Sequence, residues 1–461
     1  MSDVLTGLDS LFIHLENPRT PMHAASIGIF EGAPLTSVSG QVRIDELRQR
    51  ISSRLDGVPK LRRRVRRVPL GLGPPAWEDD PEFDLANHVH RTAVPEPGGD
   101  AELMALCAEL VSWQLDMARP LWELWFIEGL SGGRVAVLEK FHHAMADGLS
   151  GAELALVLLD AKPEKGPAPA SSDWQAQPPK RLVDVEAHDL SERAAEFARL
   201  AGAAAASVVH PSRALHAVSD VADGVRALFG RSLFAPHVPI NAAVGRHRRL
   251  ALVRQDLGEL EAAAAKQDVT VNDLLLAAVA GGLRTLLAWR GETAHEAQVL
   301  VPVGLPHAQG GELGNHVSAM VVRLPLDAEA PKTLLDQVAE ASTTAKTHHQ
   351  SRAAQVLVDA LDALPEPAIE LAGAFVQHQP FINLVVTNVP GPPVPLYAMG
   401  ARMLEAIPLV PIAGNLSVGV AALSYDGKFT VGITADRDSC PDVDVLAGGM
   451  ADTFRALCFP E

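Results

Sequence analysis

The chain has 461 residues, of which 48% are hydrophobic, and a formal net charge of −17 at pH 7. This length exceeds what one ordinary hydrophobic core organises, so we expect two domains. The apolar content argues against a disordered chain, and the acidic balance argues against a nucleic-acid binder. An anionic ligand still fits if arginine and lysine side chains collect locally, because steering depends on the local field.

Two further features bear on the compartment. The cysteines Cys107, Cys440 and Cys458 are odd in number and far apart, with no C-x-x-C spacing. They predict neither a disulfide framework nor a zinc knuckle, and they fit a reducing cytoplasm. The N-terminal stretch MSDVLTGLDS lacks the basic and apolar regions of a signal peptide.

The longest apolar tract is LLLAAVAGGLRTLLAW, residues 274–289, and it contains Gly281, Gly282 and Arg284. A membrane-spanning helix needs about 18 or more apolar residues with few charges. We therefore expect no spanning helix, and we interpret this tract as a buried core helix.

In the first part of the chain, residues 44–55 and 100–115 place apolar side chains at helical spacing. Residues 134–141, RVAVLEKF, predict a strand covered on both faces. Ser150 and Glu153 have the spacing of a capping box that opens a further helix. The predicted order is strand, histidine-containing loop, helix, with the loop held by two regular elements.

Residues 162–181 are rich in proline, alanine and polar residues, and they predict an inter-domain linker. The alanine-rich stretch 191–230 predicts helices that pack on the second domain or, alternatively, bind a membrane surface or a partner. From about residue 240, strands and helices alternate, and Tyr425-Asp426-Gly427-Lys428 predicts a hairpin turn.

These patterns indicate an α/β (α+β) protein built from two halves of similar size. We divide the chain into an N-terminal half at 1–162, a linker and alanine-rich region at 163–240, and a C-terminal half at 241–461.

The sequence FHHAMADGLSG, residues 141–151, carries the candidate chemistry. Successive side chains on a strand point to opposite sides, so His142 and His143 are poor joint ligands for one metal ion. A metal site would need distant ligands, and none stands out. A purely structural histidine loop and a general base remain as alternatives. A neutral imidazole accepts a proton from a hydroxyl near neutral pH, and a neighbouring carboxylate such as Asp147 fixes its orientation.

Two further observations concern the mechanism of such a base. Gly148 allows the loop to turn tightly after Asp147. No G-x-S-x-G elbow accompanies the histidines, so a covalent acyl-enzyme is not expected.

HHAMADG matches the HHxxxDG motif of the CoA-dependent acyltransferase superfamily. The surrounding sequence resembles the bacterial wax ester synthase/diacylglycerol acyltransferase family over nearly the whole chain, in order. The stretches that carry the resemblance are TGLDSLFIHLENPRTPMHAASIGIFEG (6–32), PEFDLANHV (81–89), LDMARPLWELWFIEGL (115–130), VNDLLLAAVAGGLR (271–284), LGNHVSAMVVRLP (313–325) and NVPGPPVPLYAMGARM (388–403).

The resemblance implies that His143 is the general base and that His142, Asp147 and Gly148 support it. Asp147 would be structural and ion-paired to an arginine, for which Arg62, Arg63, Arg64 and Arg437 are the candidates.

Two other motifs match the family. Asn272 and Asp273 match its second-domain ND motif, and an Asn-Asp pair opening an apolar helix also predicts an N-cap at Asn272. Pro120, Leu121 and Trp122 match a PLW motif, for which we expect a packing role.

The resemblance implies an O-acyltransferase with two chloramphenicol-acetyltransferase-like halves and an active-site channel between them. Acyl-CoA is the donor substrate, diacylglycerol or a long-chain alcohol is the acceptor, and no cofactor or metal is expected. Asn272 and backbone N–H groups are candidate donors to the oxyanion. We expect a cytoplasmic protein attached peripherally to a membrane or lipid droplet through apolar surface. The oligomeric state is open, with a homodimer as one candidate.

Two rival functions remain. One is a polyketide-associated or carrier-protein-dependent acyltransferase, against which the PLW and ND stretches argue. The other is a lipid-binding scaffold without activity, against which the intact spacing of His143 and Asp147 argues.

Overall fold

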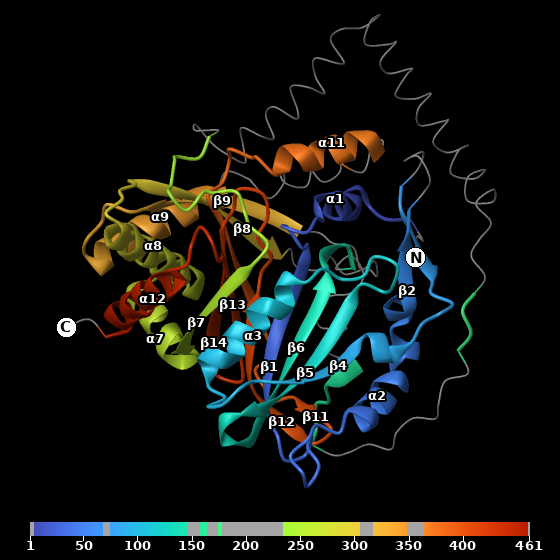
Figure 1. Ribbon diagram of the computed structural model, residues 1–461. Helices are drawn as coiled ribbons and strands as arrows, with labels where there is room; N and C mark the ends of the chain where they lie inside the picture. Colours follow the sequence, from blue (N-terminus) through green and yellow to red (C-terminus); the bar gives the residue numbers. More distant parts are fainter. Residues whose placement is uncertain are drawn as a thin grey trace, which may run out of the picture.

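The computed structural model describes residues 4–67, 74–145, 157–163, 174–177, 234–304, 317–347, 361, 364 and 366–459. Within them the chain forms two six-stranded sheets and a separate two-stranded hairpin. Figure 1 shows helices α7, α8, α9 and α12 gathered beside the second sheet, while α3 lies against the first. The predicted α/β architecture of two halves is confirmed.

The first sheet has the strand order β11-β12-β1-β6-β5-β4. β1 lies at its centre and pairs antiparallel with β6 on one side and β12 on the other. β4 and β5 run parallel and are joined through α3, a β-α-β crossover. The elements up to residue 145 are α1 (Gly7–Leu15), β1 (His23–Glu31), α2 (Ile44–Ser52), β2 (Arg63–Arg66), β3 (Ala76–Asp79), β4 (Val89–Ala93), α3 (Asp100–Ser112), β5 (Trp122–Leu130), β6 (Arg134–His142) and the short helix η6 (His143–Met145).

Strand β6 carries the histidines and is covered on both faces, as its sequence predicts. Val135 and Val137 enter one hydrophobic core, whereas Ala136 and Leu138 enter the core on the opposite face. The predicted helix over 44–55 is also present, although it ends at Ser52.

The end of helix α3 is held by a buried lysine of β6. The side chain of Lys140 is fully buried and its ammonium donates to the carbonyls of Leu110, at 3.3 Å, and Trp113, at 3.1 Å. A Glu123 carboxylate oxygen lies 3.0 Å from the same nitrogen. A cation at a helix C-terminus stabilises the exposed carbonyls and the negative end of the helix dipole. Lys140 therefore fixes α3 to the face of the sheet.

The second sheet has the order β7-β14-β13-β10-β8-β9, with β10 parallel to both β13 and β8. The predicted hairpin is present, with Asp426 at φ 46° and Gly427 at φ 78° between β13 and β14. Its elements are β7 (Arg248–Asp256), α7 (Leu257–Gln267), α8 (Val271–Arg290), β8 (Glu296–Gly304), β9 (Val317–Pro325), α9 (Pro331–Thr347), α11 (Glu366–Val376), β10 (Leu384–Pro390), β11 (Tyr397–Ala398), β12 (Ala401–Leu409), β13 (Val418–Tyr425), β14 (Lys428–Asp436) and α12 (Val443–Cys458).

Helix α8 contains the long apolar tract and is the core helix that the sequence predicts. Among the described helices it alone is long and apolar enough to cross a membrane, and 72% of that window is buried inside the protein. Its two central glycines allow close contact with α12. A Cβ at Gly281 would lie 2.1 Å from Thr453 Oγ1, and one at Gly282 would lie 2.7 Å from the Leu446 carbonyl oxygen.

The two halves are interlocked through β12, which follows β10 in the chain but completes the first sheet. Glu405 of β12 accepts from Arg254 Nε of β7 at 2.7 Å and from Thr430 Oγ1 of β14 at 3.2 Å. The backbones approach so closely that a Cβ at Gly432 would lie 1.9 Å from the Pro408 carbonyl oxygen. Because β12 belongs to the first sheet and bonds to β7 and β14 of the second, it fixes one sheet against the other.

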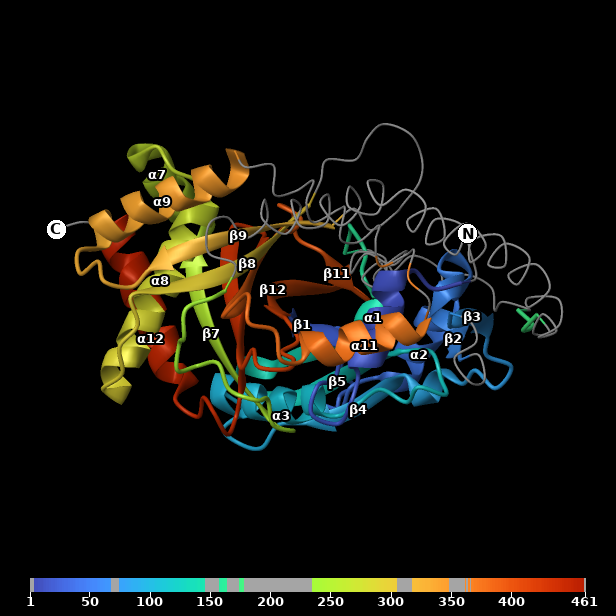
Figure 2. The same ribbon diagram turned by 90° about the horizontal axis from the view of Figure 1, so that it is seen from above.

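Figure 2 shows helices α1 and α11 lying side by side. Their contact includes Leu11 and Ile369 in one small apolar cluster and a hydrogen-bonded pair between His14 Nε2 and Glu366 Oε1 at 2.7 Å. Helix α1 is thereby held by a segment more than 350 residues away in the chain.

Several predicted features lie outside the described residues: the capping box at Ser150 and Glu153, the alanine-rich stretch 191–230, and most of the segment 162–181. In that segment Trp174 is described, and the Arg62 guanidinium lies 4.8 Å from the centre of its ring.

Candidate active site

The two histidines stand where β6 ends and η6 begins, and they enter different environments. His142 occupies the next position after Lys140 on the face that carries α3, and it is fully buried. His143 is half-buried, and its ring centre lies 4.5 Å from that of Phe12 on α1. The alternation of side chains along a strand produces this separation.

The ring of His142 is oriented by its own loop. The Ala144 N–H donates to His142 Nδ1 at 3.1 Å, so in the neutral ring the proton resides on Nε2. His142 Nε2 lies 3.6 Å from Glu16 Oε2, and both side chains are almost completely buried.

Glu16 connects the surroundings of both histidines. Its Oε1 accepts from Gln114 Nε2 at 2.9 Å, and its Oε2 accepts from the Met22 backbone N–H. The Met22 carbonyl in turn accepts the backbone N–H of His143 at 2.8 Å. This carboxylate thus fixes the backbone of His143 through Met22, and it lies beside the His142 ring without a hydrogen bond to it. Sequence reasoning missed Glu16, because a single acidic residue after a helix carries no spacing signal.

His143 combines burial with an unpaired ring nitrogen. Its Nδ1 is buried and makes no hydrogen bond to any described residue. Burial, and secondarily the neighbouring His142, lower the pKa of His143 to about 4. The ring is therefore neutral at physiological pH, which is the state that accepts a proton.

Asp147 and Gly148 lie outside the described residues, so the arginine that pairs with Asp147 stays unassigned. Each candidate arginine has another carboxylate nearby. Arg62 lies 2.6 Å from Asp56, Arg63 3.1 Å from Asp79, Arg64 3.0 Å from Glu78, and Arg437 3.7 Å from Asp438.

Pro120, Leu121 and Trp122 are buried beside the histidine strand. Trp122 Nε1 donates to the Leu61 carbonyl at 2.8 Å, and the His142 backbone N–H donates to the Leu121 carbonyl at 2.9 Å. The PLW segment thus packs the core and also anchors the backbone of the motif.

The cap of α8 differs from the expectation. The N-cap is Thr270 rather than Asn272, because the Thr270 side chain accepts the Asp273 N–H at 3.2 Å. Asp273 Oδ2 accepts the Thr270 N–H at 2.9 Å, which completes a capping box. Asn272 is partly buried in the first turn of the helix. Thr270 was missed because a Thr-x-x-Asp box competes with Asn-Asp as a cap signal.

In the described ranges, no three histidine, cysteine, aspartate or glutamate side chains come together as metal ligands. His143 itself is a neutral imidazole with an unpaired Nδ1, which is a state able to accept a proton.

Two family models match most of the chain. Residues 5–275 match the wax ester synthase/diacylglycerol acyltransferase catalytic domain, and residues 313–458 match the C-terminal domain of that family. A Mycobacterium tuberculosis protein named "Probable diacyglycerol O-acyltransferase tgs1" is 35% identical, over 98% of this chain and 95% of its own length.

Solved structures show the same fold. The wax ester synthase/diacylglycerol acyltransferase from Marinobacter aquaeolei VT8 superposes with a TM-score of 0.69 at 23% identity, covering 99% of each chain. The first condensation domain of the CDA synthetase gives a TM-score of 0.60 at 15% identity, over 100% of this chain and 97% of that one. The expected resemblance is confirmed, and the chain belongs to the wax ester synthase/diacylglycerol acyltransferase family of acyltransferases.

Proposed function

We propose that this chain transfers a long acyl group from acyl-CoA to the free hydroxyl of diacylglycerol, with long-chain alcohols as a second class of acceptor. The observation that carries the proposal is His143, a neutral and partly buried imidazole in an HHxxxDG loop. The name of the tgs1 relative and the name of the family support the choice of acceptors.

In the proposed mechanism, His143 takes the proton of the acceptor hydroxyl as the oxygen attacks the thioester carbonyl. The resulting tetrahedral intermediate collapses with cleavage of the carbon–sulfur bond, and the CoA thiolate takes the proton back from His143. No covalent acyl-enzyme forms. The lowered pKa of His143 favours this second transfer, because a thiolate is much more basic than such an imidazole.

The remaining motif residues have proposed supporting roles. Asp147 holds the loop through an ion pair, and Gly148 permits its turn. Asn272 in the first turn of α8 is a candidate donor to the oxyanion, since helix N-termini favour negative charge.

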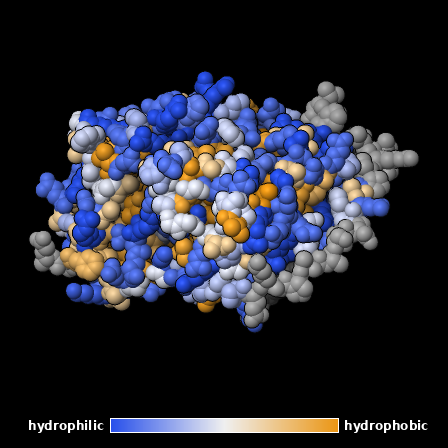
Figure 3. Space-filling view, turned by 60° about the horizontal axis from the view of Figure 1, so that its bottom comes forward, coloured by the Kyte–Doolittle hydropathy of each residue, from blue (hydrophilic) through white to orange (hydrophobic). Residues whose placement is uncertain are grey.

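The acceptor lipid would reach the protein at the apolar surface of α11. Leu371 and Phe375 on this helix are 73% and 57% exposed, whereas the face in Figure 3 is mostly hydrophilic with separate apolar patches. Helix α11 packs on α1, which carries Phe12 beside His143. We therefore propose peripheral membrane attachment of a cytoplasmic protein through α11.

Vesicle flotation tests this attachment. Wild type is expected to float with zwitterionic vesicles, and Leu371→Glu/Phe375→Glu is expected to stay in solution, because apolar burial supplies the affinity. Equal flotation of the two proteins would place the contact elsewhere.

Thiol release from palmitoyl-CoA tests the function directly. Wild type should release CoA with dioleoylglycerol or hexadecanol present and little with neither. His143→Ala should lower the rate by about 10²–10⁴-fold, as expected for loss of a general base. His295→Ala, at a surface histidine, is the matched control.

The other outcomes of this assay separate the rival functions. Release that is independent of acceptor would indicate a thioesterase. No release from a folded protein would favour a carrier-protein donor or a lipid-binding scaffold, and full activity of His143→Ala would contradict the proposed mechanism.

Substitution of Glu16 tests the positioning of His143. Glu16→Ala removes the acceptor of the Gln114 and Met22 bonds, and we expect kcat to fall about 10- to 100-fold with little change in KM for acyl-CoA, because the base is displaced. Glu16→Gln keeps the size of the side chain and should lose less. Exposed Glu261→Ala is the control.

Two readouts separate positioning from general stability. The ¹⁵N shifts of the His142 ring should change in the Glu16 variants, while the melting temperature of Glu16→Gln stays near that of wild type. An unchanged kcat in Glu16→Ala would contradict the assigned role.

A further inference from the structure

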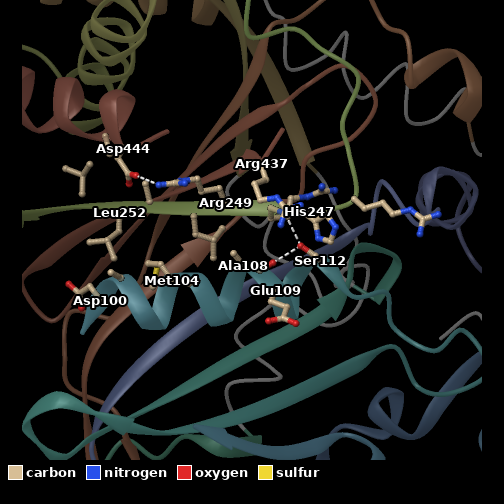
Figure 4. A pocket seen from close by; sticks show the side chains of 18 of the residues that line it. Asp100, Met104, Ala108, Glu109, Ser112, His247, Arg249, Leu252, Arg437 and Asp444 are labelled. Carbon is tan, nitrogen blue, oxygen red and sulfur yellow. Dashed lines mark hydrogen bonds and ion pairs between the residues drawn. The ribbon is translucent and has the colours of Figure 1, made fainter. Parts of the chain in front are cut away.

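The two faces of the first sheet have different surroundings near the histidine strand. On the α3 face a cavity lies between α3 and β7, and neither His142 nor His143 lines it (Figure 4). On the opposite face, Met145 of η6 shares a hydrophobic core with residues of the segment that follows α2, among them Leu61 and Trp77. The end of the turn that carries His143 is therefore buried on this second face.

Lys60 is a buried cation on the same face. It lies in the short helix η2 (Pro59–Arg62) and is only 8% exposed. Lysine is rarely buried, because removing an ammonium group from water costs free energy that hydrogen bonds and favourable charge contacts must offset. A lysine in this position therefore indicates specific contacts of its ammonium.

The Lys60 ammonium contacts the histidine turn directly. Its Nζ donates to the Met145 carbonyl oxygen at 3.1 Å. Met145 is the last residue of η6, and His143 is the first. The last carbonyls of a helix have no partner within the helix, and lysine side chains commonly satisfy them. Lys60 thus holds one end of the turn whose other end carries His143.

The His143 end of η6 is held from β1. The His143 backbone N–H donates to the Met22 carbonyl, which lies just before that strand, at 2.8 Å. A helix of three residues has little stability of its own, because it closes few internal hydrogen bonds. The orientation of His143 therefore depends on outside contacts at both ends of η6, one from Met22 and one from Lys60.

The hairpin of β2 and β3 supports Lys60. The ammonium lies 5.0 Å from the centre of the Trp77 ring on β3, within the range of a cation–π contact. Trp77 is buried and pairs with Val65 of β2 across the hairpin. The Asp80 N–H, just beyond β3, donates to the Arg62 carbonyl at 2.9 Å. The hairpin, which belongs to neither large sheet, thus holds both the backbone of η2 and the ammonium of its lysine.

Helix η2 is also joined to the first sheet without the help of Lys60. The Leu61 carbonyl accepts Trp122 Nε1 of β5 at 2.8 Å, and both residues are fully buried. Loss of the Lys60 ammonium should therefore release the end of η6 while η2 keeps its place.

We propose that Lys60 is a positioning residue for His143, that its ammonium fixes the Met145 end of η6, and that the β2–β3 hairpin is its platform through Trp77. This assignment rests on the proposed function, in which His143 is the general base. Lys60 acts through the backbone of η6 and sets the direction in which the His143 ring faces its substrate.

The first test removes the ammonium. Lys60→Met keeps an unbranched side chain of similar length, and an apolar replacement of a buried ion is often tolerated. kcat should fall about 10- to 100-fold, because a base displaced by about 1 Å loses its alignment with the hydroxyl. KM for palmitoyl-CoA and for dioleoylglycerol should stay near wild type. A kcat equal to that of wild type would overturn the assignment.

Lys428→Met is the matched control. Lys428 is an exposed lysine of β14 that also donates to a backbone carbonyl, that of Leu404 on β12, at 2.7 Å. Its kcat should equal that of wild type. Lys60→Arg keeps a cationic donor and should recover part of the kcat lost in Lys60→Met. If Lys60→Met does not fold, the shorter, neutral Lys60→Gln takes its place with the same expectations.

The second test observes the turn without substrate. In protein labelled with ¹⁵N-histidine, the backbone and ring signals of His143 are assigned by their absence in His143→Ala. These signals should shift in Lys60→Met and stay in place in Lys428→Met, while the melting temperatures of the two variants are compared as a measure of general stability. Unchanged His143 signals in a folded Lys60→Met would overturn the assignment.

The two readouts keep this inference separate from the proposed function. If the His143 signals respond to Lys60→Met but even wild type transfers no acyl group, the positioning role stands and the proposed function fails. If wild type transfers acyl groups and His143→Ala does not, while Lys60→Met matches Lys428→Met in kcat and in its signals, the proposed function stands and the positioning role fails.

Discussion

The alternation of side chains at the end of β6 is the constraint on which the site depends. Two adjacent histidines cannot share one environment on a strand. His142 is therefore buried beside Glu16 and accepts the Ala144 N–H, while His143 lies against Phe12. Each ring keeps one buried nitrogen, His142 Nε2 or His143 Nδ1, without a hydrogen bond in the described residues. The ring of His142 is tied to its own loop, whereas the ring of His143 contacts α1. Burial then keeps the His143 ring neutral, since an apolar setting disfavours the imidazolium form.

Contacts from both halves hold the elements around strand β6 in place. Glu405 of β12 bonds across to the second sheet, and Lys140 holds the end of α3. Gln114, two residues beyond α3, reaches Glu16. The backbone of His143 is therefore linked through Met22 and Glu16 to the end of helix α3.

Periodicity in the sequence predicted the elements that have strong local signals, including β6, α8 and the hairpin at Asp426. It failed where tertiary contacts decide. Glu16 acquires its role only when Gln114 and Met22 bond to it in the folded chain. Strand β12 pairs with β1, which lies far away in the sequence, and no local pattern in the sequence predicts that pairing. At α8 two cap signals overlapped, and Thr270 prevailed over Asn272 because its hydroxyl reaches the Asp273 N–H.

The most direct test of the account is the titration of the His143 ring, followed by ¹⁵N NMR of histidine-labelled protein and assigned by its absence in His143→Ala. Because burial lowers the pKa of His143 to about 4, the ring should remain neutral from neutral pH down to about pH 5.5, where an exposed histidine is mostly protonated. Half-protonation of His143 near about pH 6.5 would contradict the account, because the ring would then lie in water rather than in a buried site that favours its neutral form.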